Sequence, residues 1–240
     1  MFKASHIMTK KLVKMNLSFL QRLFSSFQIL PSAWLLILQF LILILSLVLP
    51  DHPNYRIILW ALGVVVLLLI AKVIRQTPMF TALGLFFVGG ALLFSCSLLF
   101  VIESPNLQIL AHLFEAAAYF SAAYGLVRYM FEDRYLTMDE LFAAGAVFTL
   151  LAWAFAFLYS ICQLLNPYSF SAQADLASWL DLLFLSFSLQ SATGLSELIP
   201  STPLAKVMAM LQMFGGVMYL ALIVSRLIAL QYIQHKQKGR

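Results

Sequence analysis

The chain has 240 residues and a net charge of +5; 62% of its residues are hydrophobic and only 10% are charged. So few charged residues cannot form the polar surface of a soluble domain of this length, and the composition therefore excludes an ordinary soluble protein. The basic residues do not cluster with exposed aromatic residues, so nucleic acid is not an expected partner. Cys96 and Cys162 both lie in apolar runs, which indicates small buried hydrophobes and neither a disulfide nor a metal site.

Residues 1–30 are predicted to form a basic amphipathic segment. Hydrophobic residues recur in it at helical spacing, at Leu12, Met15, Phe19, Leu23 and Phe27. Lysine and arginine side chains lie around this stripe, at Lys10, Lys11, Lys14 and Arg22. The pattern is typical of a helix that lies on the inner membrane surface, and the alternative is a short unstructured tail.

Five long apolar runs follow, each close to the roughly 20 residues that a helix needs to cross the hydrocarbon of a membrane. They cover residues 33–49, 57–74, 79–102, 107–130 and 141–165. The runs are continuous and do not alternate, which predicts helices and not a β-barrel. Short turns that contain proline break the first three pairs, so residues 31–131 are predicted to form a peripheral membrane domain of four antiparallel helices.

The pattern changes after the fifth run. Residues 176–190 form a shorter apolar stretch, residues 191–203 are rich in Ser, Thr, Gly and Pro, and residues 204–232 are apolar again. A stretch this short between two full spans predicts a re-entrant helix, which enters the membrane and returns on the same side. The predicted fold is thus an all-α membrane protein with six transmembrane helices and a re-entrant pore helix and filter loop between the fifth and sixth. Residues 132–233 are the predicted pore domain, and residues 234–240 are a basic tail.

The distribution of basic residues predicts the orientation. If the N-terminus lies inside, only Arg56 and Lys206 of the 15 Lys and Arg residues lie outside. This bias follows the positive-inside rule and requires an even number of crossings, so residues 176–190 do not cross. We expect a multi-pass protein of the cell inner (plasma) membrane with both termini cytoplasmic. Membrane lipids are expected partners, because a basic tail attracts anionic headgroups.

The segment 186–205 reads SFSLQSATGLSELIPSTPLA. It resembles the pore helix, filter and outer loop of the potassium channel superfamily, and more narrowly a bacterial group of six-span channels without voltage-sensor arginines. That group has a TVGYGD-like filter followed by a turn of the form Pro-x-Thr-Pro-Leu-Ala-Arg, and Lys206 takes the place of the arginine. The resemblance covers residues 134–230, and the first four spans share only the layout. It implies passive conduction of monovalent cations, with potassium the first candidate and no cofactor.

The resemblance places the selectivity filter on Ala192, Thr193, Gly194, Leu195 and Ser196. In such a filter, carbonyl oxygens replace the water shell of the ion, and the C-terminal end of the pore helix offers it a partial negative charge. Ala192 lacks the hydroxyl of the innermost ion site, and Leu195 lacks the aromatic ring behind the filter. Ser196 replaces a glycine, where a positive φ is expected to strain a non-glycine residue. These departures predict a filter that passes sodium as well as potassium.

Two further sets of pore residues are predicted. Glu197 and Asp181 are assigned to the outer mouth, where fourfold repetition of a carboxylate would concentrate cations. Gly215 and Gly216 lie near the middle of the last span and are predicted to form a gating hinge, because glycine makes a helix easier to bend. The alternative for this pair is close helix packing by small residues.

The fourth span carries two polar residues within the membrane, His112 and Glu115, three positions apart. Such residues are functional candidates by default, so Glu115 could sense protons or pair with Gln39. The alternative is a packing role in which Glu115 is hydrogen-bonded to His112 or Tyr119. The span ends with a single arginine, Arg128, which predicts weak or absent classical voltage gating because each charge contributes only about 2.3 kcal/mol per 100 mV.

A chain that carries a single pore loop needs four copies to close a ring, so the expected partner is the chain itself as a homotetramer. We therefore predict the pore-forming subunit of a tetrameric cation channel. No nucleophile and base pair, phosphate loop or metal-ligand spacing is evident, so an enzyme is not expected and the only predicted metals are transient monovalent cations. The alternative function is a non-conducting membrane assembly or scaffold protein with a pore-like fold.

Overall fold

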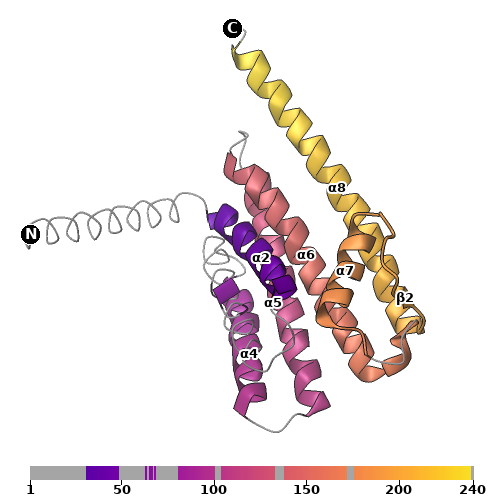
Figure 1. The fold of residues 1–240 in the computed structure, drawn as a ribbon. Coiled ribbons are helices and arrows are strands. Elements are labelled where there is room, and N and C mark those ends of the chain that lie inside the picture. The colour runs from indigo at the N-terminus through magenta and orange to yellow at the C-terminus, as the bar shows by residue number, and fades with distance from the viewer. Residues whose placement is uncertain are drawn as a thin grey trace, which may run out of the picture.

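The computed structural model consists almost wholly of helices (Figure 1). It describes residues 31–48, 63, 65, 66, 68, 81–100, 104–132, 138–171 and 176–238. The predicted N-terminal segment, most of the predicted second span and the last two residues of the basic tail lie outside the described residues.

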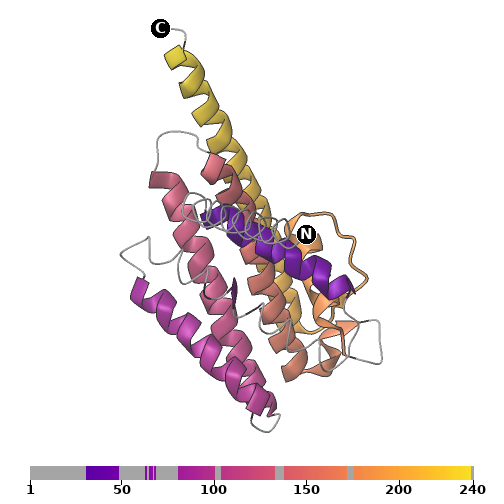
Figure 2. The ribbon, with the colours of Figure 1, turned by 60° about the vertical axis from the view of Figure 1, so that its left-hand side comes forward.

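The first half of the described chain forms a set of packed apolar helices. These are α2 (Pro31–Val48), α4 (Thr81–Phe100), α5 (Pro105–Glu132) and α6 (Met138–Leu165). Helix α6 is central, because it packs against α5 and α2 on one side and against the later helices α7 and α8 on the other (Figures 1 and 2). Many residues that α6 buries are small, and small side chains let helices approach closely in lipid; they include Ala143, Ala146, Ala152, Ala154 and Ala156.

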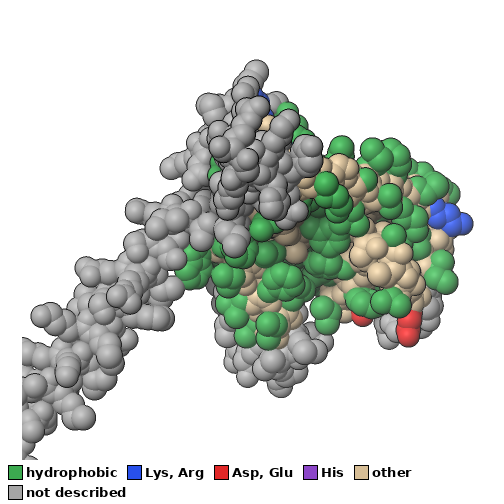
Figure 3. All heavy atoms as spheres, turned by 90° about the horizontal axis from the view of Figure 1, so that it is seen from above, with side chains coloured by type: hydrophobic (Ala, Val, Ile, Leu, Met, Phe, Trp, Pro, Cys, Tyr) green, Lys and Arg blue, Asp and Glu red, His purple; other side chains and the backbone are tan. Residues whose placement is uncertain are grey.

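Three helices in the described residues are long and apolar enough to cross a membrane. They are the stretches Pro105–Phe131, Glu140–Leu165 and Pro203–Ala229. The apolar parts of α2 and α4 are shorter, Ser32–Leu45 and Ala82–Ser97. Few charged side chains are visible when the molecule is seen from above, where hydrophobic ones dominate the described surface (Figure 3). The prediction of apolar membrane helices is thus supported for these three, while the total of six remains a prediction.

The two ends of the segment between α6 and the last helix lie next to each other. After α6 come the 3-10 turn η1 (Pro167–Ser169) and strand β1 (Phe170–Ser171). Helix α7 (Trp179–Gln190) follows, and strand β2 (Ile199–Pro200) then pairs antiparallel with β1, with Phe170 opposite Pro200. The backbone N–H of Ser201 also donates to the carbonyl of Ser169, at 2.8 Å.

Helix α7 has only 12 residues. At 1.5 Å per residue it is about 18 Å long, well short of the roughly 30 Å of membrane hydrocarbon. Helix α8 (Pro203–Lys238) begins directly after β2 and extends past the other helices at its C-terminal end (Figures 1 and 2). A hydrophobic cluster holds α7 between α6 and α8, and its buried members are Tyr159, Cys162, Phe170, Leu182, Leu185, Leu189, Ala205 and Ala209.

Candidate functional site

The predicted filter residues form a loop that is tied to the last turns of α7. The carbonyl oxygen of Ser188 accepts the backbone N–H groups of Thr193 and Gly194, at 3.0 and 3.3 Å. The hydroxyl of the same Ser188 accepts the N–H of Ser196, at 3.1 Å. Ser188 is buried, so one residue of α7 anchors the loop at three points.

The carbonyl groups of this loop differ from its N–H groups in their hydrogen bonding. Within the part of the chain that the structure describes, the carbonyl oxygens of residues 192–196 accept no hydrogen bond. Residues Ala192 to Leu195 are exposed in the single chain. A run of free carbonyl oxygens on a loop whose N–H groups are held behind it is the arrangement that can replace the water shell of a cation.

The sequence predicts backbone strain from a positive φ at Ser196, but the structure has the positive φ at Ala192. Among the described residues, Ala192 is the one non-glycine residue with positive φ, 58°, and Gly194 has a φ of 66°. The prediction of a left-handed Ser196 is therefore wrong: its N–H is held by Ser188, and the left-handed turns come earlier in the loop. Ala192 carries a side chain in a conformation that costs a non-glycine residue about 1–2 kcal/mol.

The two predicted outer-mouth carboxylates lie at different ends of this region. Glu197 is exposed at the end of the loop. Asp181 lies in the first turn of α7, where it forms a capping box with Ser178. Its Oδ2 accepts the N–H and the hydroxyl of Ser178, at 3.1 and 2.7 Å. Capping satisfies free N–H groups at the start of a helix and is reason enough for an aspartate here, so a role of Asp181 at the mouth stays a prediction.

The two glycines of α8 have different surroundings. Gly215 is exposed, and a Cβ added to it would have no neighbour within 4 Å. Gly216 is buried, and a Cβ there would lie 2.5 Å from the carbonyl oxygen of Gln190. Close packing against the end of α7 therefore requires a glycine at position 216, while α8 runs through both positions without a break. The hinge role of the pair stays a prediction.

The polar residues of the predicted fourth span form a local cluster in α5 that is separate from the loop. The Nδ1 atom of His112 lies 2.9 Å from Oε2 of Glu115, and the hydroxyl of Ser95 in α4 donates to Oε1 of Glu115 at 2.8 Å. The option that Glu115 pairs with Gln39 is not what the structure shows, because the contacts of Glu115 are with His112 and Ser95, while Gln39 accepts the hydroxyl of Thr149 at 2.6 Å. The packing interpretation with His112 agrees with these contacts.

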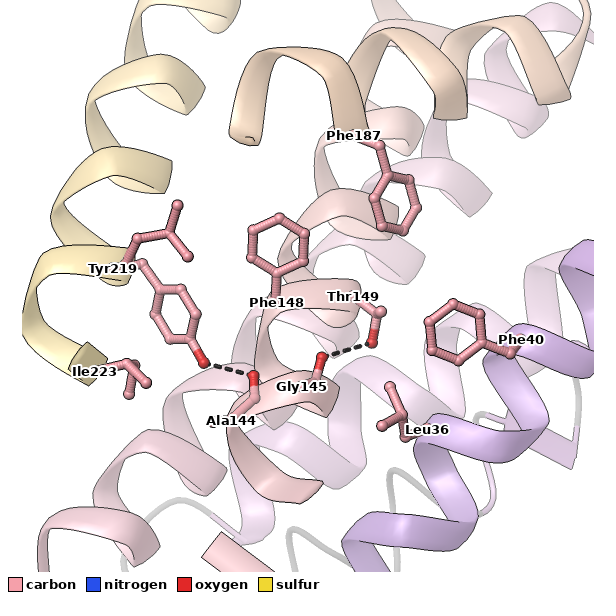
Figure 4. Close-up of a pocket in the computed structure, with 10 residues that line it drawn as sticks. Leu36, Phe40, Ala144, Gly145, Phe148, Thr149, Phe187, Tyr219 and Ile223 are labelled. Atoms are coloured by element: carbon pink, nitrogen blue, oxygen red, sulfur yellow. Dashed lines mark hydrogen bonds between the residues drawn. The ribbon is translucent and has the colours of Figure 1, made fainter. Parts of the chain in front are cut away.

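A cavity of about 420 Å³ lies between α2, α6, α7 and α8 (Figure 4). Its lining is almost wholly apolar, with Phe148, Phe187 and Leu36 among the side chains around it. At its edge the hydroxyl of Tyr219 donates to the carbonyl of Ala144 at 2.6 Å, which connects α8 to α6. Without charged or free polar groups, this cavity offers nothing to a cation, so it is distinct from the loop.

Sequence reasoning missed Ser188 and two buried glutamines, Gln190 and Gln212, that lie behind the loop. A usable signal was present, because a polar side chain inside an apolar helix must find a partner. In the described residues, no group of three or more His, Cys, Asp or Glu side chains could hold a metal ion.

Residues 144–231 match the sequence model of a family described as ion channel. The match begins in α6, includes α7 and the whole loop, and ends in α8. No curated protein and no solved structure matches the chain. The matched region and the apolar helices together support a membrane protein that carries the pore module of an ion channel.

Proposed function

We propose that the chain is the pore-forming subunit of a homotetrameric cation channel that conducts potassium with reduced selectivity over sodium. The observation that carries this proposal is that the carbonyl oxygens of residues 192–196 accept no hydrogen bond from the described part of the chain, on a loop that is tied to α7 by hydrogen bonds to Ser188. The match of this region to an ion channel family supports the same function.

The proposed tetramer follows from the high free-energy cost of exposing unpaired polar groups to lipid. Backbone carbonyls exposed to hydrocarbon are strongly unfavourable, so a non-helical loop at membrane depth must line a protein or water cavity. Four copies around one axis supply such a cavity and surround it with carbonyl oxygens. Helix α8 also leaves the most surface free for neighbours, with 22% of its apolar window buried against 44% and 50% for α5 and α6.

The re-entrant path of α7 is part of the same proposal. A helix of 12 residues is too short to cross, and the pairing of Phe170 with Pro200 brings the two ends of the segment together. Residues 170 and 200 would then lie on the outer side, with Glu197 at the mouth, both termini cytoplasmic and the protein in the inner (plasma) membrane. Cysteines introduced at positions 168 and 201, which are both exposed, should react with an impermeant thiol reagent from the same side of the membrane.

The side chains of the loop support reduced selectivity. The hydroxyl of Thr193 is 3.1 Å from that of Ser191 and 3.3 Å from the carbonyl of Ser188, so it turns back toward α7. Leu195 is 68% exposed, so its side chain does not pack behind the loop as an aromatic ring would. A loop without an aromatic ring packed behind it holds its carbonyls less rigidly and discriminates less between ions of different size.

The test is cation flux into liposomes that contain the purified protein, under a potassium or a sodium gradient. We expect flux of both ions from the wild type and its loss in Gly194→Ala, because a Cβ is strained at a φ of 66°. Gly89→Ala is the matched control: Gly89 in α4 also has nothing within 4 Å of an added Cβ, and no positive φ. A tetramer without flux under any gradient would favour the scaffold alternative, and a strict monomer would exclude a ring of four loops.

A further inference from the structure

A buried network of hydrogen bonds joins α7 to its two neighbouring helices behind the loop. Gln212 of α8 has no exposed surface. Its Oε1 accepts the hydroxyl of Tyr159 at 2.6 Å. Its Nε2 donates to the carbonyl and the hydroxyl of Ser186, at 3.0 and 2.6 Å, and lies 3.2 Å from Oε1 of Gln190. A single side chain of α8 therefore contacts both α6 and α7.

The network continues from α7 into the backbone of α6. The hydroxyl of Ser186 donates to the carbonyl of Ala152, and Nε2 of Gln190 donates to the carbonyl of Phe148, both at 2.6 Å. Gln190 is 1% exposed. Its amide oxygen and nitrogen both have partners, and so do those of Gln212. The last turn of α7 is thus held by polar contacts from two helices, in surroundings where an unpaired polar group is strongly unfavourable.

This network lies directly behind the anchor of the loop. Ser186 and Gln190 are four positions apart and so share one face of α7. Ser188, between them in sequence, holds the loop through its carbonyl and hydroxyl. Gly216 follows Gln212 by one turn of α8 and lies against the backbone of Gln190. A shift of α8 relative to α7 therefore acts on Ser186 and Gln190, which lie in the same last turns of α7 as Ser188.

We infer that Gln212 is a positioning residue that couples α8 to the loop carbonyls, so that ion selectivity and the stability of the conducting state depend on its hydrogen bonds. This inference rests on the proposed channel function. Moving α8 away from α7 breaks the contacts of Gln212 with Ser186 and Gln190 together, because all of them depend on one amide group. The contacts of Gln212 with α7 are thus made or lost together, whereas Ser186 and Gln190 keep their own hydrogen bonds to the backbone of α6.

The test compares Gln212→Met with Gln163→Met in single-channel recordings of the tetramer. Methionine keeps the length of glutamine and removes its hydrogen bonds. Gln163 is a matched control, because its amide pairs with the backbone N–H and carbonyl of Ala177 at the other end of α7, at 3.0 and 3.1 Å. We expect Gln212→Met to change the potassium to sodium permeability ratio or the mean open time by about fivefold, while Gln163→Met leaves both near the wild-type value.

Failure of this inference is distinguishable from failure of the proposed function. A conducting wild type whose ratio and open time are unchanged in Gln212→Met would overturn the coupling and leave the channel intact. A wild type that conducts nothing would overturn both. If Gln212→Met does not assemble, Tyr159→Phe removes one hydrogen bond and keeps the packing; we expect a smaller shift in the same readouts, and their invariance would equally overturn the coupling.

Discussion

The guanidinium of Arg226 in α8 lies 3.2 Å from the carboxylate of Glu140 in the first turn of α6. Glu140 is 1% exposed, and Arg226 also lies over the ring of Phe131 at the end of α5, with its Cζ 4.7 Å from the ring centroid. This cluster joins α8 to the start of α6 and the end of α5. A buried charge that loses its partner is strongly destabilising, so the pair is expected to hold α8 against α6.

Replacing Arg226 by methionine should lower the stability of the folded protein by about 3–5 kcal/mol, because it removes the ion-pair partner of the buried Glu140 carboxylate. Thermal unfolding in detergent measures this change. The double variant with Glu140→Gln should recover part of the loss, since the buried negative charge is then removed as well. Lys206→Met is the control, because Lys206 is exposed at the start of the same helix; an equal loss in both single variants would contradict the assignment.

The apolar runs and their proline-containing turns gave the helices of the described chain to within a few residues. The run predicted at 107–130 is α5 at Pro105–Glu132, and the run predicted at 141–165 is α6 at Met138–Leu165. This is expected where a long continuous hydrophobic stretch dominates, since lipid leaves a helix as the only spanning structure available. The short length of α7 was equally clear from the sequence.

The partners of the polar residues could not be predicted, because they depend on how the helices are rotated against one another. Polar side chains in apolar runs, such as Glu115 and Gln39, are expected to have hydrogen-bond partners. The sequence does not show that these partners are Ser95 and Thr149. The strained position in the loop was misplaced for a similar reason. The positive φ at Ala192 lies where the chain turns from the end of α7 into the loop that is bonded to Ser188, and no local sequence pattern predicts that position.

Replacing Ala192 by glycine should stabilise the protein, because glycine adopts a φ of 58° without the strain that a Cβ causes. The expected gain is about 1 kcal/mol, reduced somewhat by the greater freedom of glycine in the unfolded chain. Thermal unfolding checks the direction. Ala177→Gly is the control, because Ala177 lies shortly before α7 and its own φ is not positive, so it should not stabilise; a loss of stability in Ala192→Gly would contradict the strain.

The two glycines of α8 separate packing from hinge bending. Gly216→Ala should destabilise the protein by about 1–3 kcal/mol, because the new methyl group would overlap the backbone of Gln190. Gly215→Ala meets no neighbour and should fold normally. Unfolding curves and channel open probability are measured on both variants. A changed open probability in the well-folded Gly215→Ala would support the hinge, and wild-type gating would leave close packing at Gly216 as the explanation for the glycine there.

Replacing Ser188 by alanine tests the anchor of the loop. The substitution removes the hydroxyl that accepts the N–H of Ser196 and keeps the carbonyl that accepts Thr193 and Gly194. The outer half of the loop should then loosen, which should bring the potassium to sodium permeability ratio closer to one. Ser160→Ala is the matched control, because this buried hydroxyl donates only within its own helix, to the carbonyl of Ala156 at 3.2 Å. If bi-ionic reversal potentials of the two variants agree with the wild type, Ser188 does not set the geometry of the filter; if both shift alike, the effect belongs to general packing.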